Sequence, residues 1–184
     1  AKFHIASHGG FLPFKVHSMF THEKMVADKY LAWHQTKEKK LIRLSPVQLL
    51  KNKNINVNKQ SCLILNWSIS GHLINLLSLP YAAQYNICFK NLCEMIKNLN
   101  PKIREKSIYR THEVDSLKTF KKFSKKFREI KVHESVGGTR LIDEMKNAKL
   151  VICTHPSTSI SEAIIADIPT VIVFPEQLFM LTED

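Results

Sequence analysis

Short apolar runs alternate with segments of helical periodicity from residue 61 to the end of the chain. The runs predict buried strands at 61–67, 106–110, 131–134, 150–153 and 170–174. Between them, apolar residues at helical spacing predict helices at 81–99, 117–130, 139–147 and from Ser157 onward. Apolar strands of this kind are covered on both faces, as in parallel sheets. The pattern therefore predicts an α/β fold, a Rossmann-like parallel sheet with helices on both faces.

A similar pattern is present in the first 45 residues. Short apolar runs predict strands at 2–7, 30–33 and 41–44, and a helix is expected within 14–28. Ser45 and Pro46 are typical of a helix start, because serine is a good N-cap and proline suits the first helical position. Residues 51–60 are polar and rich in asparagine. We therefore expect a loop there and a domain boundary in this part of the chain.

The composition is that of a soluble globular protein, with 44% hydrophobic and 23% charged residues. No apolar run reaches the roughly 20 residues that a membrane-spanning helix needs, and no signal peptide is visible. The four cysteines lie in apolar surroundings without metal-ligand spacing, so we expect reduced core residues: Cys62, Cys88, Cys93 and Cys153. These features predict a cytoplasmic protein.

The formal charge of +11 is unevenly distributed, because residues 1–60 carry 11 basic and 3 acidic side chains. A basic surplus favours anionic partners, such as nucleotides, phosphorylated sugars, anionic lipid or nucleic acid, without choosing among them. The lysine-rich segment 117–130 is best explained as the solvated face of an amphipathic helix. It lacks the interleaved aromatic and basic residues of a single-strand platform, so we expect no nucleic-acid partner.

Three polar clusters fall at the expected carboxyl ends of strands, where open α/β folds bind ligands. They are His8–Gly10, Arg110–Glu113 and Thr154–Ser159. An arginine offers a planar fork for phosphate, and a helix start rich in hydroxyls offers N–H and O–H donors. Together the clusters predict a site for a diphosphate or a nucleotide.

Each cluster also has a structural explanation. The glycines of the first could serve only a tight turn, Arg110 could pair with Glu113 or Asp115 on the surface, and Ser157 could be a plain N-cap. The sequence has no metal-binding motif, so we expect no metal. The glycine-rich fingerprints of dinucleotide-binding and P-loop proteins are absent as well.

In order and spacing, four motifs resemble those of GT-B-fold transferases of bacterial surface-carbohydrate biosynthesis. More distantly, they resemble CDP-glycerol glycerophosphotransferases and polysialyltransferase-like proteins. The motifs are a His-Gly turn, an Asp-x-Tyr-x-x-Trp strand, an Arg-x-His segment and a Ser-Thr helix start with Glu-Ala and Ile-Pro-Thr after it: His8–Gly10, Asp28–Trp33, Arg110–His112, Ser157–Thr158, Glu162–Ala163 and Ile168–Thr170. Thr111 and Glu113 replace prolines of the glycerophosphotransferases, which weakens that link, and Asp167 replaces a glycine or asparagine at the helix end.

The resemblance implies that residues 1–45 end an acceptor-side N-terminal domain and that residues 46–184 form a truncated nucleotide-donor-binding domain. The chain would then be a piece of a longer protein. Two histidines are implied as catalytic, His8 as a base at the reacting centre and His112 at the donor's phosphates. The implied nucleotide-binding residues are Gly9, Gly10, Arg110, Thr154, His155, Ser157, Thr158, Ser159 and Glu162.

The implied reaction transfers a sugar or polyol-phosphate from a nucleotide-activated donor to a surface glycan. It needs no cofactor, because helix dipoles, arginine and histidine can offset the charge of the leaving diphosphate. The implied partners are a nucleotide-sugar or CDP-polyol donor and a glycan or lipid-linked acceptor, with contact at the inner face of the membrane left open. Two alternatives stay open, a non-hydrolysing nucleotide-sugar epimerase and a non-catalytic basic module that binds anionic glycan or lipid.

Overall fold

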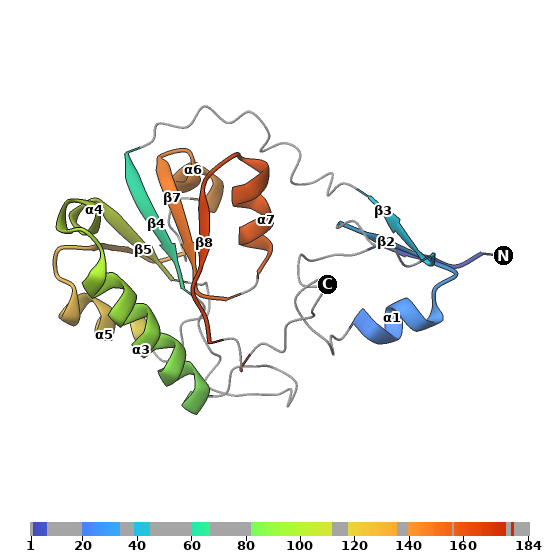
Figure 1. Cartoon of the computed structure of the whole chain (residues 1–184), viewed down its shortest axis with the longest axis horizontal. Coiled ribbons are helices and arrows are strands. Elements are labelled where there is room, and N and C mark those ends of the chain that lie inside the picture. The colour runs from blue at the N-terminus through green and yellow to red at the C-terminus, as the bar shows by residue number, and fades with distance from the viewer. Residues whose placement is uncertain are drawn as a thin grey trace.

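The described strands form two separate sheets, in which the ladders between these strands are all parallel (Figure 1). The computed structural model describes residues 2–6, 20–33, 39–44, 60–66, 82–111, 118–135, 140–155, 157–175 and 178. The predicted helix start at Ser45–Pro46 and residues 51–59 of the predicted loop at 51–60 lie outside these residues. The expected division between residues 45 and 46 stays a prediction for that reason.

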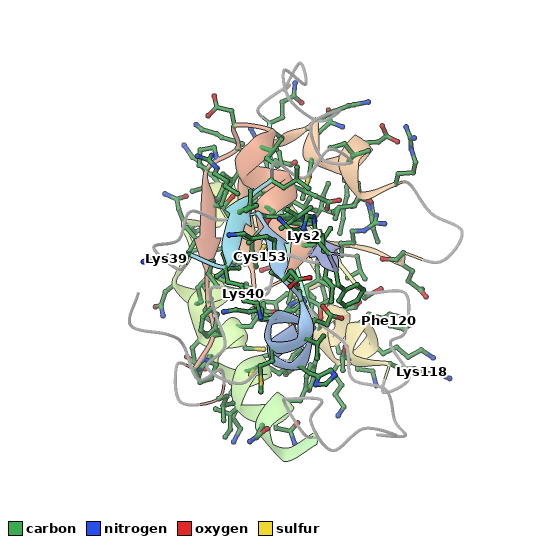
Figure 2. The ribbon with its side chains drawn as sticks, turned by 90° about the vertical axis from the view of Figure 1, so that its right-hand side faces the viewer. Lys2, Lys39, Lys40, Lys118, Phe120 and Cys153 are labelled. Carbon is green, nitrogen blue, oxygen red and sulfur yellow. The ribbon has the colours of Figure 1, made fainter. Side chains whose placement is uncertain are left out.

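The first sheet is small and has the order β1-β2-β3. Its strands are His4–Ala6, Lys29–Ala32 and Leu41–Arg43, and helix α1 (Phe20–Val26) precedes β2. Asp28 fixes the start of β1, because its Oδ2 atom accepts a hydrogen bond of 2.6 Å from the backbone N–H of Phe3. Figure 2 labels three lysines of this part of the chain, Lys2, Lys39 and Lys40. Lys40 has a local role, since its Nζ donates to the carbonyl of Met25 at 2.7 Å.

The second sheet has five strands in the order β6-β5-β4-β7-β8. The strands are β4 (Ser61–Leu65), β5 (Ser107–Arg110), β6 (Lys131–His133), β7 (Ala148–Cys153) and β8 (Thr170–Ile172). This part of the chain therefore begins in the middle strand, β4, adds β5 and β6 on one side of it, and then adds β7 and β8 on the other side. This is the strand order of a doubly wound Rossmann-type sheet, and it confirms the predicted fold class.

Helices cover both faces of this sheet, and the alternation along β4 assigns each helix to a face (Figure 1). Cys62 and Ile64 pack with helices α3 (Ala82–Asn98) and α5 (Thr119–Lys126). Leu63 and Leu65 pack with helices α6 (Leu141–Met145) and α7 (Thr158–Ile165). Because successive strand residues point to opposite faces, a strand that is apolar at every position needs cover on both of its sides.

The predicted helices and strands agree with the structure to within a few residues at their ends. Among the described elements, the short helix α4 (Pro101–Glu105) was not predicted. Asn100 is in fact an N-cap whose Oδ1 accepts from the N–H of Lys102 at 3.0 Å, with proline in the first turn. The four cysteines are free and buried, as predicted. Among the described residues, no helix has both the length and the apolar character to span a membrane.

Candidate functional site

The carboxyl edge of the five-stranded sheet has a topological switch point between β4 and β7. From β4 the chain adds β5 and β6 on one side and then β7 and β8 on the other, so the connections after β4 and β7 leave in opposite directions. Ligands of open α/β folds bind in the crevice at such a point. Two polar residues follow these strands directly, Asn66 after β4 and Thr154 after β7.

Asn66 joins four elements through a buried hydrogen-bond network. Its Nδ2 donates to the hydroxyls of Tyr85 in α3, at 2.8 Å, and Tyr109 in β5, at 2.6 Å. The hydroxyl of Thr154 donates to Asn66 Oδ1 at 2.9 Å and lies 3.3 Å from the carbonyl oxygen of Leu65. Since the amide of Asn66 is engaged on both sides, this network holds the strand ends in place and does not itself offer a binding group. Thr154 was a predicted site residue, and the structure gives it this positioning role.

The first turn of helix α7 lies immediately after Thr154, and one residue there has an unusual environment. Ser157 occupies the N-cap position with extended backbone angles, yet its side chain makes no capping hydrogen bond. Ser157 is only 8% exposed, and its buried Oγ has no hydrogen-bond partner within the described part of the chain. Buried hydroxyls are normally hydrogen-bonded. Ser157 is therefore the N-cap of α7 by position, but its side chain does not cap the helix, and its Oγ is a candidate group for binding a ligand.

The other predicted residues of this segment lie around the same turn. Thr158 and Ser159 open the helix and are half-buried, as is His155 before it. Burial raises the pKa of the Glu162 carboxyl above its ordinary value. Burial also raises the pKa of Cys153, at the end of β7, to about 12. That thiol is protonated near neutral pH and is not a nucleophile.

Arg110 ends β5 and forms a buried ion pair that the sequence analysis missed. Its Nη1 atom lies 2.8 Å from Oε1 of Glu144 in α6, and the two side chains are 10% and 4% exposed. Its expected surface partners, Glu113 and Asp115, lie outside the described residues. Oε2 of Glu144 is buried and has no hydrogen-bond partner among the described residues. Glu144 thus fixes Arg110 in one place at the edge of the sheet.

His133 is a second residue that the sequence analysis missed, because it was given no role. It ends β6, and its Nδ1 lies 2.9 Å from the same Oε1 of Glu144, with 39% of the side chain exposed. The ends of β5 and β6 are tied together, since Thr111 N–H donates to the carbonyl of His133 at 3.1 Å and Ser135 Oγ donates to the carbonyl of Thr111. A carboxylate on one ring nitrogen orients an imidazole and leaves the other nitrogen to face outward.

The sheet register places these groups on one face. His133 pairs with Arg110, Arg110 with Leu65, and Leu65 with Cys153. Residues paired in this way point to the same side of a sheet, and Leu65 and Cys153 face α6 and α7. Arg110 and His133 therefore share the face of the α7 N-terminus. Arg110 is two strand spacings, roughly 10 Å, from the end of β7, a gap that a nucleotide diphosphate can bridge.

One signal for Glu144 was present in the sequence. It lies three residues after Leu141 and next to Met145, on the apolar side of its helix, where a carboxylate needs a buried partner.

The predicted residues His8, Gly9, Gly10 and His112 lie outside the described residues, so their roles stay predictions. Within the described ranges, no group of three or more histidine, cysteine or acidic side chains could hold a metal ion.

Comparison with known proteins gives a family. The model of the LIC12162 family transferase matches the chain over residues 1–184. The chain therefore belongs to this family. A search of curated proteins found no match.

Proposed function

We propose that this member of the LIC12162 transferase family moves a sugar or polyol-phosphate from a nucleotide-activated donor to a surface glycan. The observation that carries the proposal is the buried Oγ of Ser157, which has no hydrogen-bond partner among the described residues and stands at the start of a helix beside the switch point. A helix N-terminus attracts anions through its free N–H groups and its dipole. A donor phosphate would accept hydrogen bonds from Ser157 and from the N–H groups of Thr158 and Ser159.

Arg110 supplies positive charge on the same face of the sheet. Its ion pair with Glu144 holds the guanidinium in a fixed place, and the donor diphosphate would share this guanidinium with Glu144. In the transfer step the leaving nucleotide diphosphate gains negative charge. Arg110 and the α7 N-terminus would stabilise this charge through groups that are in place beforehand, which is the efficient arrangement for transition-state stabilisation.

Proton transfer needs an acid or base at the same edge. His133, oriented by Glu144, is the described histidine with suitable geometry, and its ring is partly exposed to a ligand. His8 and His112 are our further candidates, on the resemblance to GT-B enzymes. The acceptor we propose is a glycan or lipid-linked glycan, which the enzyme would meet in the cytoplasm at the inner face of a membrane.

The proposal is tested by thermal unfolding with CMP, CDP, UDP, GDP and their sugar conjugates. A ligand at one hundred times its dissociation constant stabilises the folded protein by about 2.7 kcal/mol. We expect a rise in Tm with one nucleotide class and loss of most of that rise in Ser157→Ala. The matched control is Ser124→Ala, whose hydroxyl donates to the carbonyl of Phe120 within α5 and should not affect the nucleotide response.

Two results would contradict the proposal: no Tm shift with any nucleotide, or equal shifts in the wild type and Ser157→Ala. Once a donor is found, product analysis distinguishes transfer from epimerisation, because only transfer releases free nucleotide in net turnover. The family's description as a transferase favours release.

A further inference from the structure

A cavity of about 850 Å³ lies at the opposite, amino-terminal edge of the five-stranded sheet. Its wall contains the first residues of three strands, Ser61 of β4, Ser107 of β5 and Lys131 of β6, and also Pro169, which directly precedes β8. The candidate donor site is at the carboxyl edge, so the two sites are separated by the length of the strands. The volume is within the range of about 300–1,000 Å³ that small-molecule sites occupy. We call it the amino-edge cavity.

Four lysines and one carboxylate line the amino-edge cavity, Lys102, Lys106, Lys131, Lys149 and Glu105. In the part of the chain that the structure describes, none of these lysines forms an ion pair or a side-chain hydrogen bond. A hollow lined mainly by one sign of charge concentrates ions of the opposite sign.

The basic side chains near the cavity behave differently from those that line it. Arg104 lies between Lys102 and Lys106 in sequence, and its Nε is 2.8 Å from Glu129 Oε1. At the two ends of α6, Arg140 before the helix and Lys146 after it both contact Asp143. Carboxylates therefore neutralise these three cations, whereas the cavity lysines have no such ion pair and can attract a bound anion.

Apolar side chains also line the cavity, and both of its serine hydroxyls are already engaged. Ile103, Ile108 and Leu150 contribute to its wall. The two serines at the strand starts already donate their hydroxyl protons, Ser61 to the carbonyl of Asn147 and Ser107 to the carbonyl of Ile103, each at 2.9 Å. Recognition here would rest on the lysine charges and on contact with the apolar side chains, which suits an anion with an apolar or aromatic body.

The strand order also limits the kind of anion. Lys131 begins β6 and Lys149 is the second residue of β7, and these strands are three spacings apart in the sheet, roughly 14 Å. The backbones of these two lysines are farther apart than a single inorganic phosphate is wide, so an extended anion fits this spacing better. We propose that the amino-edge cavity binds a phosphorylated organic anion of about nucleotide size, and that this site is separate from the donor site.

Pyridoxal 5′-phosphate is a suitable probe, because it combines a phosphate, an aromatic ring and an aldehyde. The aldehyde condenses with a nearby lysine amine to an imine with loss of water, and borohydride reduction fixes the label for peptide mass spectrometry. We expect labelling of the four cavity lysines at about tenfold lower probe concentration than labelling of Lys121 and Lys122, because a basic hollow concentrates the anion by that order. AMP should protect the cavity lysines. Equal labelling of all these lysines, or no protection, overturns the proposal.

Two matched double variants separate the site from general attraction to a basic protein. In Lys131→Gln/Lys149→Gln, labelling of Lys102 and Lys106 should need about tenfold more probe. Lys121→Gln/Lys122→Gln removes the same amount of charge from α5, and it should not change the probe concentration that labelling of Lys102 and Lys106 needs. Equal effects of the two double variants overturn the proposal.

Ser157→Ala at the other edge should also leave labelling of the cavity unchanged. If Ser157→Ala weakens this labelling as much as Lys131→Gln/Lys149→Gln does, the bound probe lies at the carboxyl edge, and the proposal of a separate site is overturned. Failure of the donor-site test does not affect any of these outcomes.

Discussion

Replacement of Ser157 by alanine gives the sharpest test of the site, because the two explanations of this residue predict opposite signs. A serine that caps a helix stabilises it, and its loss costs about 1 kcal/mol. Ser157 makes no capping hydrogen bond, and its Oγ is buried without a hydrogen-bond partner among the described residues. A buried polar group in that state costs about 1–3 kcal/mol of stability, which alanine removes.

We therefore expect Ser157→Ala to raise the free energy of unfolding by about 1 kcal/mol, the low end of that cost. For a chain of this size, this corresponds to a rise in Tm of about 2–4 °C. The same variant should lose most of its response to nucleotide. The loss of binding with a gain in stability identifies a residue whose environment suits a ligand.

Asn100→Ala is the matched control in the same domain. Asn100 is an N-cap with a real capping bond, from Lys102 N–H to Oδ1 at 3.0 Å. Its replacement should lower the free energy of unfolding by about 1 kcal/mol. Urea unfolding of the three proteins measures both changes. If Ser157→Ala loses as much stability as Asn100→Ala, Ser157 is an ordinary cap and our reasoning about the site is refuted.

Three further changes test other parts of the fold. Glu144→Ala should lower the free energy of unfolding in urea by about 3–5 kcal/mol, because it leaves Arg110 buried without its carboxylate. The double variant Arg110→Met/Glu144→Leu should recover most of that loss, because it removes both charges. Additive losses would contradict this. Burial raises the pKa of Glu162, so the folded chain holds that proton more tightly and stability falls as pH rises from the ordinary carboxyl value through the raised one. Glu162→Gln should therefore be more stable than the wild type at neutral pH but not at acidic pH, and an unchanged difference in Tm across pH would contradict this. Asp167 has a φ of 56°, so Asp167→Gly should raise the free energy of unfolding by about 0.5–1 kcal/mol, and a fall in Tm would count against backbone strain there.

The layers of the fold could be predicted from the sequence because β4 and β7 are apolar at successive positions. A run such as Cys62–Leu65 cannot leave either face in water, so helices on both sides and a parallel sheet follow. The helix α4 could not be predicted as easily, because Asn100-Pro101 is both a typical helix end and a typical helix start. Its five residues carry too little periodicity to decide between the two.

Only the part of the candidate site that is contiguous in sequence could be predicted. Thr154 and Ser157 belong to one strand–turn–helix segment, and their place at the carboxyl edge follows from that local order. Glu144 and His133 join Arg110 from two other elements. Their meeting depends on the register of β5 against β6 and on the position of α6, which sequence periodicity does not give.

The two polar systems at the carboxyl edge face opposite sides of the sheet, and this division indicates where a ligand would bind. Asn66 follows Leu65, so it faces α3, where its amide groups are hydrogen-bonded to two tyrosines and a threonine. The side that faces α6 and α7 holds Ser157 Oγ and Glu144 Oε2, which are buried and lack hydrogen-bond partners among the described residues. A folded domain tolerates few such atoms, and they need an explanation where they occur. Since a guanidinium, a serine hydroxyl and a helix N-terminus share that side, an anion there would be bound by Arg110, Ser157 Oγ and the first N–H groups of α7, while the Asn66 network keeps the strand ends fixed.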